Sequence, residues 1–192
     1  MVRKLHVLFS ACMLSLAVAL PQAAVGAGLD PRLYVIVSNQ AKVPADLIDD
    51  AISELSRIYR TIGVELTAGT ALPADFTGSF VAVTIARSRQ CRLMRLSELA
   101  LGSAVPGGTL AFVMYDRVVS LSSRAGLRQS EALALVMAHE IGHLLMPDGK
   151  HASFGLMAAT WTSRDLRFAD TLGLGFQHGE AATIRAQLAI GR

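Results

Sequence analysis

Cysteine and charged residues are both scarce in this chain. Only two of its 192 residues are cysteines, Cys12 and Cys91, which excludes the disulfide framework that stabilises many small secreted proteins. Charged residues make up 17% and the net charge is only +3, so bulk electrostatics gives no reason to expect nucleic-acid binding. Apolar residues reach 52%, too many for an intrinsically disordered chain. The sequence therefore predicts a compact domain with an ordinary hydrophobic core.

The chain also lacks an apolar run long enough for a transmembrane helix. Its longest candidate, 7–20, follows Arg3 and Lys4 and falls short of the roughly 20 residues that a span requires. A basic start, an apolar stretch and small residues up to Ala27 are typical of a secretory signal peptide, although an uncleaved anchor would share the first two features. We expect residues 1–27 to be removed after Ala27. The remaining domain, 28–192, would then be secreted or lie in the periplasm or cell envelope, with no stable membrane span.

The order of expected elements predicts an α+β fold. Four segments have the β-branched or apolar composition of strands, at 32–37, 64–67, 80–86 and 109–115. Apolar spacing and helix-boundary residues predict a helix from Pro44 to Gly63, a long apolar helix from an N-cap at Ser130 to about Met146, and shorter helices near 164–171 and 180–190. Most of the sheet precedes the long helix, as in α+β layer arrangements.

One motif on the long helix has the residue types and spacing of a catalytic zinc site. His139-Glu140-Ile141-Gly142-His143 places two imidazoles four residues apart, on one helix face. Zn²⁺ binds neutral imidazole nitrogens, and a catalytic site keeps one position open for water. Glu140 follows the first ligand and is placed to take the proton of that water. The motif predicts one catalytic Zn²⁺ with Glu140 as the general base.

A third ligand must reach the metal from a different direction, and the sequence offers three candidates. His151 follows Pro147 and Gly149, a pair that ends the helix and permits a left-handed reversal of the chain. Asp148 lies inside that turn, where a short carboxylate more often binds nearby backbone N–H groups. Glu180, on a later helix, is the alternative that a gluzincin-type peptidase would use. We expect His151 to complete the site.

The motif resembles that of the metzincin clan of zinc peptidases, whose extended pattern is H-E-x-x-H-x-x-G-x-x-H/D followed by a turn that contains methionine. The core of the pattern matches, but Met146 stands at the glycine position and Gly149 at the third-ligand position. His151 comes eight residues after His143, two more than in the clan. Gly155-Leu156-Met157 resembles the methionine turn, with Met157 as its methionine.

The resemblance implies a mixed β-sheet packed with a backing helix and a zinc-binding active-site helix. A small C-terminal subdomain would hold the methionine turn and a terminal helix. It further implies that an extended peptide substrate pairs with a sheet edge at 109–115, through Thr109, Leu110, Ala111 and Phe112. Trp161 would either fill the core near the site or line a substrate pocket.

These observations predict a secreted zinc metallopeptidase that cleaves peptide bonds by Glu140-assisted attack of water held at the zinc. Two other readings remain open at this point. A non-catalytic zinc-binding or peptide-binding module could use the same scaffold, and some cytosolic regulatory proteases share the His-Glu-Ile-Gly-His string. The expected partner is a peptide or protein substrate. The sequence makes no prediction of oligomeric state.

Overall fold

The computed structural model describes residues 31–90, 97, 99–167 and 174–191. The expected signal peptide, 1–27, and Cys91 lie outside these residues. Among the helices of the described part, none is long and apolar enough to cross a membrane.

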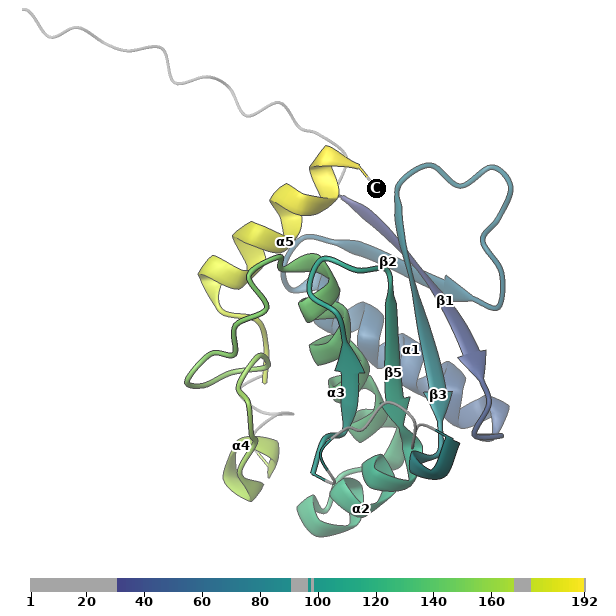
Figure 1. Ribbon diagram of the computed structural model, residues 1–192, viewed down its shortest axis with the longest axis vertical. Helices are drawn as coiled ribbons and strands as arrows, with labels where there is room; N and C mark the ends of the chain where they lie inside the picture. Colours follow the sequence, from purple (N-terminus) through teal and green to yellow (C-terminus); the bar gives the residue numbers. More distant parts are fainter. Residues whose placement is uncertain (1–30, 91–96, 98, 168–173, 192) are drawn as a thin grey trace, which may run out of the picture.

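A single mixed sheet forms the frame of the molecule (Figure 1). Its strands are β1 (Arg32–Asn39), β2 (Glu65–Gly69), β3 (Ser79–Ala86), β4 (Gly102–Ala104) and β5 (Leu110–Met114). They lie in the order β2-β1-β3-β5-β4, and all neighbours are parallel except the antiparallel pair of β4 and β5. Many of their apolar side chains, such as Val35, Val81 and Val113, are fully buried, whereas Phe80 and Leu110 are exposed. The expected mixed sheet is confirmed.

Helices pack on one face of this sheet (Figure 1). They are α1 (Ala45–Arg60), α2 (Tyr115–Ala125), α3 (Gln129–Leu145), α4 (Ser163–Arg167) and α5 (His178–Ile190). α1 buries the single stripe of Ala51, Leu55 and Ile58, whereas 14 of the 17 residues of α3 are buried. α3 is thus the central helix, with α1, α2 and α5 packed around it and the sheet beside it.

The helix boundaries agree with the sequence in part. Pro44 directly precedes α1, and Gly63 adopts φ +69° just after it, as expected of a helix stop. The expected N-cap at Ser130 is wrong, because α3 begins at Gln129 and its N-cap is Arg128, two residues earlier than expected. The Glu131 carboxylate accepts a hydrogen bond from the Arg128 backbone N–H at 2.9 Å, which caps the helix from within. Of the expected helix at 164–171, α4 covers the start, and residues 168–171 lie outside the described part.

Two elements were not predicted, and one of them moves the edge of the sheet. The strand expected at 109–115 ends at Met114, and α2 follows it without a loop. β4, with the sequence Gly-Ser-Ala, has no strand-like composition and forms only because it pairs with β5. The prediction that Thr109, Leu110, Ala111 and Phe112 form the free edge is therefore wrong. β5 lies between β3 and β4, and the Thr109 carbonyl accepts a hydrogen bond from Ala82 of β3.

Candidate metal centre

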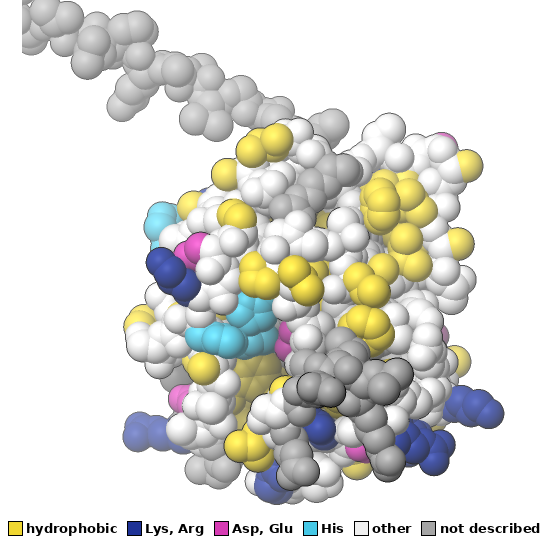
Figure 2. All heavy atoms as spheres, in the orientation of Figure 1, with side chains coloured by type: hydrophobic (Ala, Val, Ile, Leu, Met, Phe, Trp, Pro, Cys, Tyr) yellow, Lys and Arg dark blue, Asp and Glu magenta, His cyan; other side chains and the backbone are white. Residues whose placement is uncertain are grey.

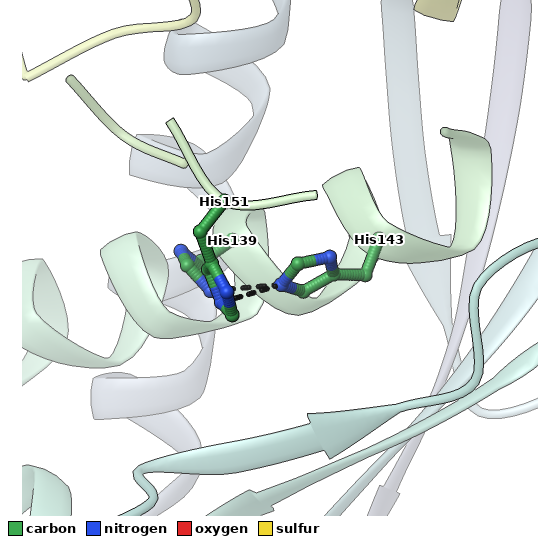
Figure 3. Close-up of side chains that lie close together, drawn as sticks. All are labelled: His139, His143 and His151. Carbon is green, nitrogen blue, oxygen red and sulfur yellow. Dashed lines mark hydrogen bonds between the residues drawn. The ribbon is translucent and has the colours of Figure 1, made fainter. Parts of the chain in front are cut away.

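Three imidazoles converge on one point near the C-terminal end of α3 (Figure 3). The Nε2 atom of His143 lies 3.1 Å from Nε2 of His139 and 3.1 Å from Nε2 of His151. His139 and His143 come from successive turns of α3, and His151 comes from the loop that follows it. Among the described residues these three are the group whose donor atoms lie close enough to share a metal ion. The structure thus brings together the three ligands expected from the sequence.

A backbone carbonyl fixes the protonation of the first imidazole. Nδ1 of His139 donates to the Leu156 carbonyl at 2.8 Å, which leaves the lone pair of Nε2 pointing at the cluster. The indole N–H of Trp161 donates to the same carbonyl at 3.2 Å. Trp161 is partly buried and its ring packs edge-on against His139. The residue is therefore both a support of the ligand and part of the wall of the site.

Burial keeps two of the imidazoles in the form that binds a metal. Desolvation is the main cause that lowers the pKa of His143 to about 4, and the neighbouring histidines lower it further. Desolvation also lowers the pKa of His139. Both rings are neutral at pH 7, as metal coordination requires. Together with His151 they form a set of three imidazole nitrogens that suits Zn²⁺ and leaves a fourth position open.

Glu140 is buried beside the imidazole cluster. Burial raises the pKa of its carboxyl to about 8, and a cation bound by the neighbouring imidazoles would favour the ionised form. β4 lies directly against this side chain, because a Cβ atom added to Gly102 would fall 2.5 Å from Glu140 Oε1. Glycine at position 102 thus allows the strand to approach the carboxyl closely. Glu140 is held in place by an element that the sequence did not predict.

The loop after α3 turns back toward the helix at Gly149. α3 ends at Leu145, Met146 is extended, and Gly149 adopts φ +59°, the left-handed conformation expected from the sequence. A side chain at position 149 would also overlap the ring of Pro106. This reversal carries His151 back to the two helical ligands.

Met157 lies beneath the ligands, in a turn that begins at Gly155. Gly155 has φ +84°, and Ala152 N donates to the Met157 carbonyl at 2.8 Å, which closes the loop on itself. The Met157 side chain is fully buried. A Cβ atom added to Gly142, between the two helical ligands, would lie 2.5 Å from the Met157 sulfur. The turn therefore packs its methionine under the metal-binding segment of α3, as the resemblance implied.

The two other candidates for the third ligand are engaged elsewhere. Asp148 is exposed, and its Oδ1 accepts a hydrogen bond from Lys150 N at 3.4 Å within the same turn. Glu180 accepts from the Gln177 backbone N–H at 2.6 Å and caps the start of α5. Neither belongs to the imidazole cluster.

A cleft of about 530 Å³ opens in front of the imidazoles. Figure 2 shows the histidine side chains gathered on this face beside a hollow with apolar side chains at its base. Its lining comes from β4 with the residues before it, one face of α3, the end of α2 and the segment around Trp161. It includes Glu140 and the three imidazoles, so a molecule bound in it would contact the whole site.

The comparisons with known proteins found matches in fold. Neither a protein-family model nor a curated protein sequence matches the chain. Archaemetzincin from Methanopyrus kandleri matches it with a TM-score of 0.51 and 15% identity, over 86% of this chain and 99% of that one. A zinc-dependent peptidase from Methanocorpusculum labreanum (strain Z) matches with a TM-score of 0.52 and 15% identity, over 79% and 99%. The chain has a metzincin-like zincin fold.

The residues of this zincin fold that shape the cleft are not identified by the sequence analysis. Gly102 and Ser103 line it from β4, and Leu121 and Arg124 line it from α2. β4 is too short and its residues too small to signal a strand. For α2 a signal existed, since Val118, Leu121 and Ala125 recur at helical spacing and are buried.

Proposed function

We propose that the protein is a zinc metallopeptidase that hydrolyses peptide bonds in the cleft beside α3. The observation that carries this proposal is the convergence of three imidazoles with a buried carboxyl, Glu140, in one open cleft. The fold that the chain shares with zinc-dependent peptidases supports it. A metal site that only stabilised the fold would be expected to be closed by a fourth protein ligand.

The chemistry follows from the position of Glu140. Zinc held by the three imidazoles would polarise the scissile carbonyl and lower the pKa of a water molecule beside it. The Glu140 carboxylate accepts a proton from the attacking water as the new C–O bond forms. It then gives this proton to the amine nitrogen as the C–N bond breaks, which returns the carboxylate to its starting state. Because β4 lies directly against this side chain at Gly102, the strand would restrict the carboxyl to the cleft during both transfers.

The substrate would lie along β4, in place of the edge expected at 109–112. β4 pairs with β5 on one side and has no other neighbour in the described sheet. Gly102, Ser103 and Ala104 all line the cleft. An extended peptide adds readily to such a free edge through main-chain hydrogen bonds.

Replacement of the carboxyl by an amide tests the catalytic role. Glu140→Gln should keep the zinc content of the parent and lower kcat by about 10²–10⁴-fold, since the amide cannot accept the proton. Metal analysis and a broad peptide-library digest measure both quantities, and Glu54→Gln, on the surface of α1, serves as the control. Full activity of Glu140→Gln with the same zinc content would contradict the mechanism. A parent that binds zinc but cleaves no peptide would favour a non-catalytic zinc-binding or peptide-binding module.

We also propose that the enzyme acts outside the cytoplasm, on the basis of the N-terminal pattern of basic, apolar and small residues. Expressed with its own N-terminus in a bacterium, it should be recovered outside the cytoplasm and begin at Gly28 or within a few residues of it. Mass spectrometry of the purified protein measures this start. An intact Met1 in a soluble cytosolic fraction would instead favour a cytosolic regulatory protease.

A further inference from the structure

The cleft extends beyond the metal centre toward the start of α3. Val136, His139, Glu140 and His143 line it, a spacing that places them on one face of the helix. Val136 lies about 4.5 Å along the helix axis from His139 and about 10 Å from His143, at 1.5 Å per residue. Leu121 and Arg124, three residues apart on α2, line the cleft as well. Because α2 packs against α3, this part of the cleft lies between the two helices.

Arg124 brings a positive charge to this part of the cleft. It is exposed, it lies in the last turn of α2, and it is the sole arginine or lysine among the described residues that line the cleft. Within the described part of the chain, no ion pair or hydrogen bond joins its guanidinium to a protein partner. Other arginines of the same region differ, since Arg117 donates to two backbone carbonyls and Arg128 pairs with Glu131.

Near Arg124, the described lining of the cleft offers few other groups that could distinguish a charged ligand from an uncharged one. Leu121 and Val136 are apolar, and β4 contributes only small residues. Besides Arg124 and the three imidazoles, the ionisable side chain of the described lining is Glu140, which the proposed mechanism uses. A guanidinium binds carboxylates through paired hydrogen bonds, because its planar N–H groups match the two carboxylate oxygens.

We propose that Arg124 selects peptides that carry a carboxylate close to the cleaved bond. An extended chain advances about 3.3–3.6 Å per residue, so about three residues cover the roughly 10 Å of cleft between His143 and Val136, and Arg124 lines the same cleft. The carboxylate is that of an Asp or Glu side chain or of the C-terminus of the peptide. The inference rests on the proposed peptidase function and names the substrate class of that site.

Matched peptides and variants test this selectivity. Peptides carry Asp or Glu at each of three positions on either side of the cleaved bond and are compared with Asn or Gln versions, and free-acid C-termini are compared with amides. The zinc-loaded parent should cleave the best acidic peptide with a kcat/KM about tenfold above that of its neutral version. Which pair shows the difference identifies the source of the carboxylate.

Variants of Arg124 assign the preference to its charge. Arg124→Met should bring the acidic-to-neutral ratio close to one, and Arg124→Glu should invert the preference toward peptides with Lys or Arg at the same position. Arg60→Met is the matched control, because Arg60 is an exposed arginine in the last turn of α1 and does not line the cleft. It should keep the ratio of the parent.

Calorimetry of the same peptides with zinc-loaded Glu140→Gln separates this inference from the function on which it rests. Cleavage by the parent without a charge preference would overturn the role of Arg124 and leave the peptidase intact. Acidic peptides that bind about tenfold tighter but are not cleaved by the parent would support Arg124 and overturn the peptidase. If the parent and Arg124→Met show the same preference for acidic over neutral peptides, both in kcat/KM and in Kd, the proposal is wrong.

Discussion

The metal centre is built by two regions that obey different physical rules. α3 supplies His139, Glu140 and His143 from a buried helix whose backbone fixes their relative positions. The ligand loop, residues 146–161, supplies His151 from an exposed position after a left-handed turn. The helical half depends on local hydrogen bonds along the chain, whereas the loop half depends on contacts with distant residues such as Pro106.

The two regions nevertheless contact and orient each other. The Leu156 carbonyl of the ligand loop orients His139 on the helix, and Met157 packs beneath Gly142. An ion bound between them would add a third connection, through His151. Disturbing the loop should therefore affect metal binding most, and disturbing the contact between the regions should affect stability.

Removal of the loop ligand is expected to have the largest effect. His151→Ala should weaken zinc binding by about 100-fold or more, about 3 kcal/mol, because the two helical ligands remain but the third direction of approach is lost. Asp148→Ala and Glu180→Ala should bind zinc like the parent, since both carboxylates bond to backbone N–H groups. Competition with a chelator of known affinity measures all three. Tight binding by His151→Ala together with its loss in Glu180→Ala would make the site gluzincin-like.

Removal of the metal should destabilise the ligand loop more than the interior of α3. At a free zinc concentration 100 times Kd, the bound ion adds about 2.7 kcal/mol to the free energy of unfolding, so chelation should lower Tm by about 5–10 °C. Hydrogen exchange should quicken at Ala152 N, which bonds within the ligand loop, more than in the interior of α3. Calorimetric scans and exchange with and without chelator measure both effects. An unchanged Tm, or equal loss of protection in both regions, would contradict the comparison.

The contact between the regions should show a smaller effect. Gly142→Ala should lower the free energy of unfolding by about 2 kcal/mol, because the added methyl group overlaps the Met157 sulfur and outweighs the helix propensity of alanine. Gly179→Ala is the control, since a Cβ atom there meets nothing within 4 Å and α5 should be unchanged or slightly stabilised. Urea unfolding of both variants measures the difference. Equal stability of the two variants would show that Met157 yields to the methyl group without cost.

How far each feature could be read from the sequence depends on the range of the interactions that form it. The His139–His143 pair and the helix that carries it follow from local periodicity, and so do α1 and the stop at Gly63. The left-handed Gly149 was predicted from residue type, and the structure confirms it. The expected N-cap at Ser130 is wrong because the Glu131 side chain reaches back to Arg128 and starts the helix earlier.

The edge strand of the sheet, by contrast, could not be predicted from the sequence. Leu110 and Phe112 have the composition of a strand, but composition does not state whether a strand has one neighbour or two. β4 has no such composition and exists because the backbone of Ser103 pairs with Phe112 and because Gly102 fits against Glu140. A prediction from residue types alone therefore assigned the edge to β5.

The sequence by itself determined the metal-binding helix, its two imidazoles and the carboxyl between them, because a helix repeats every 3.6 residues and places neighbours four apart on one face. It also made a reversal after α3 available, through Pro147 and Gly149. The tertiary structure alone decided that this reversal meets Pro106, that Met157 lies under Gly142, and that β4 and Arg124 form walls of the cleft. These features join residues far apart in the chain, and no local pattern of side chains encodes such a distance.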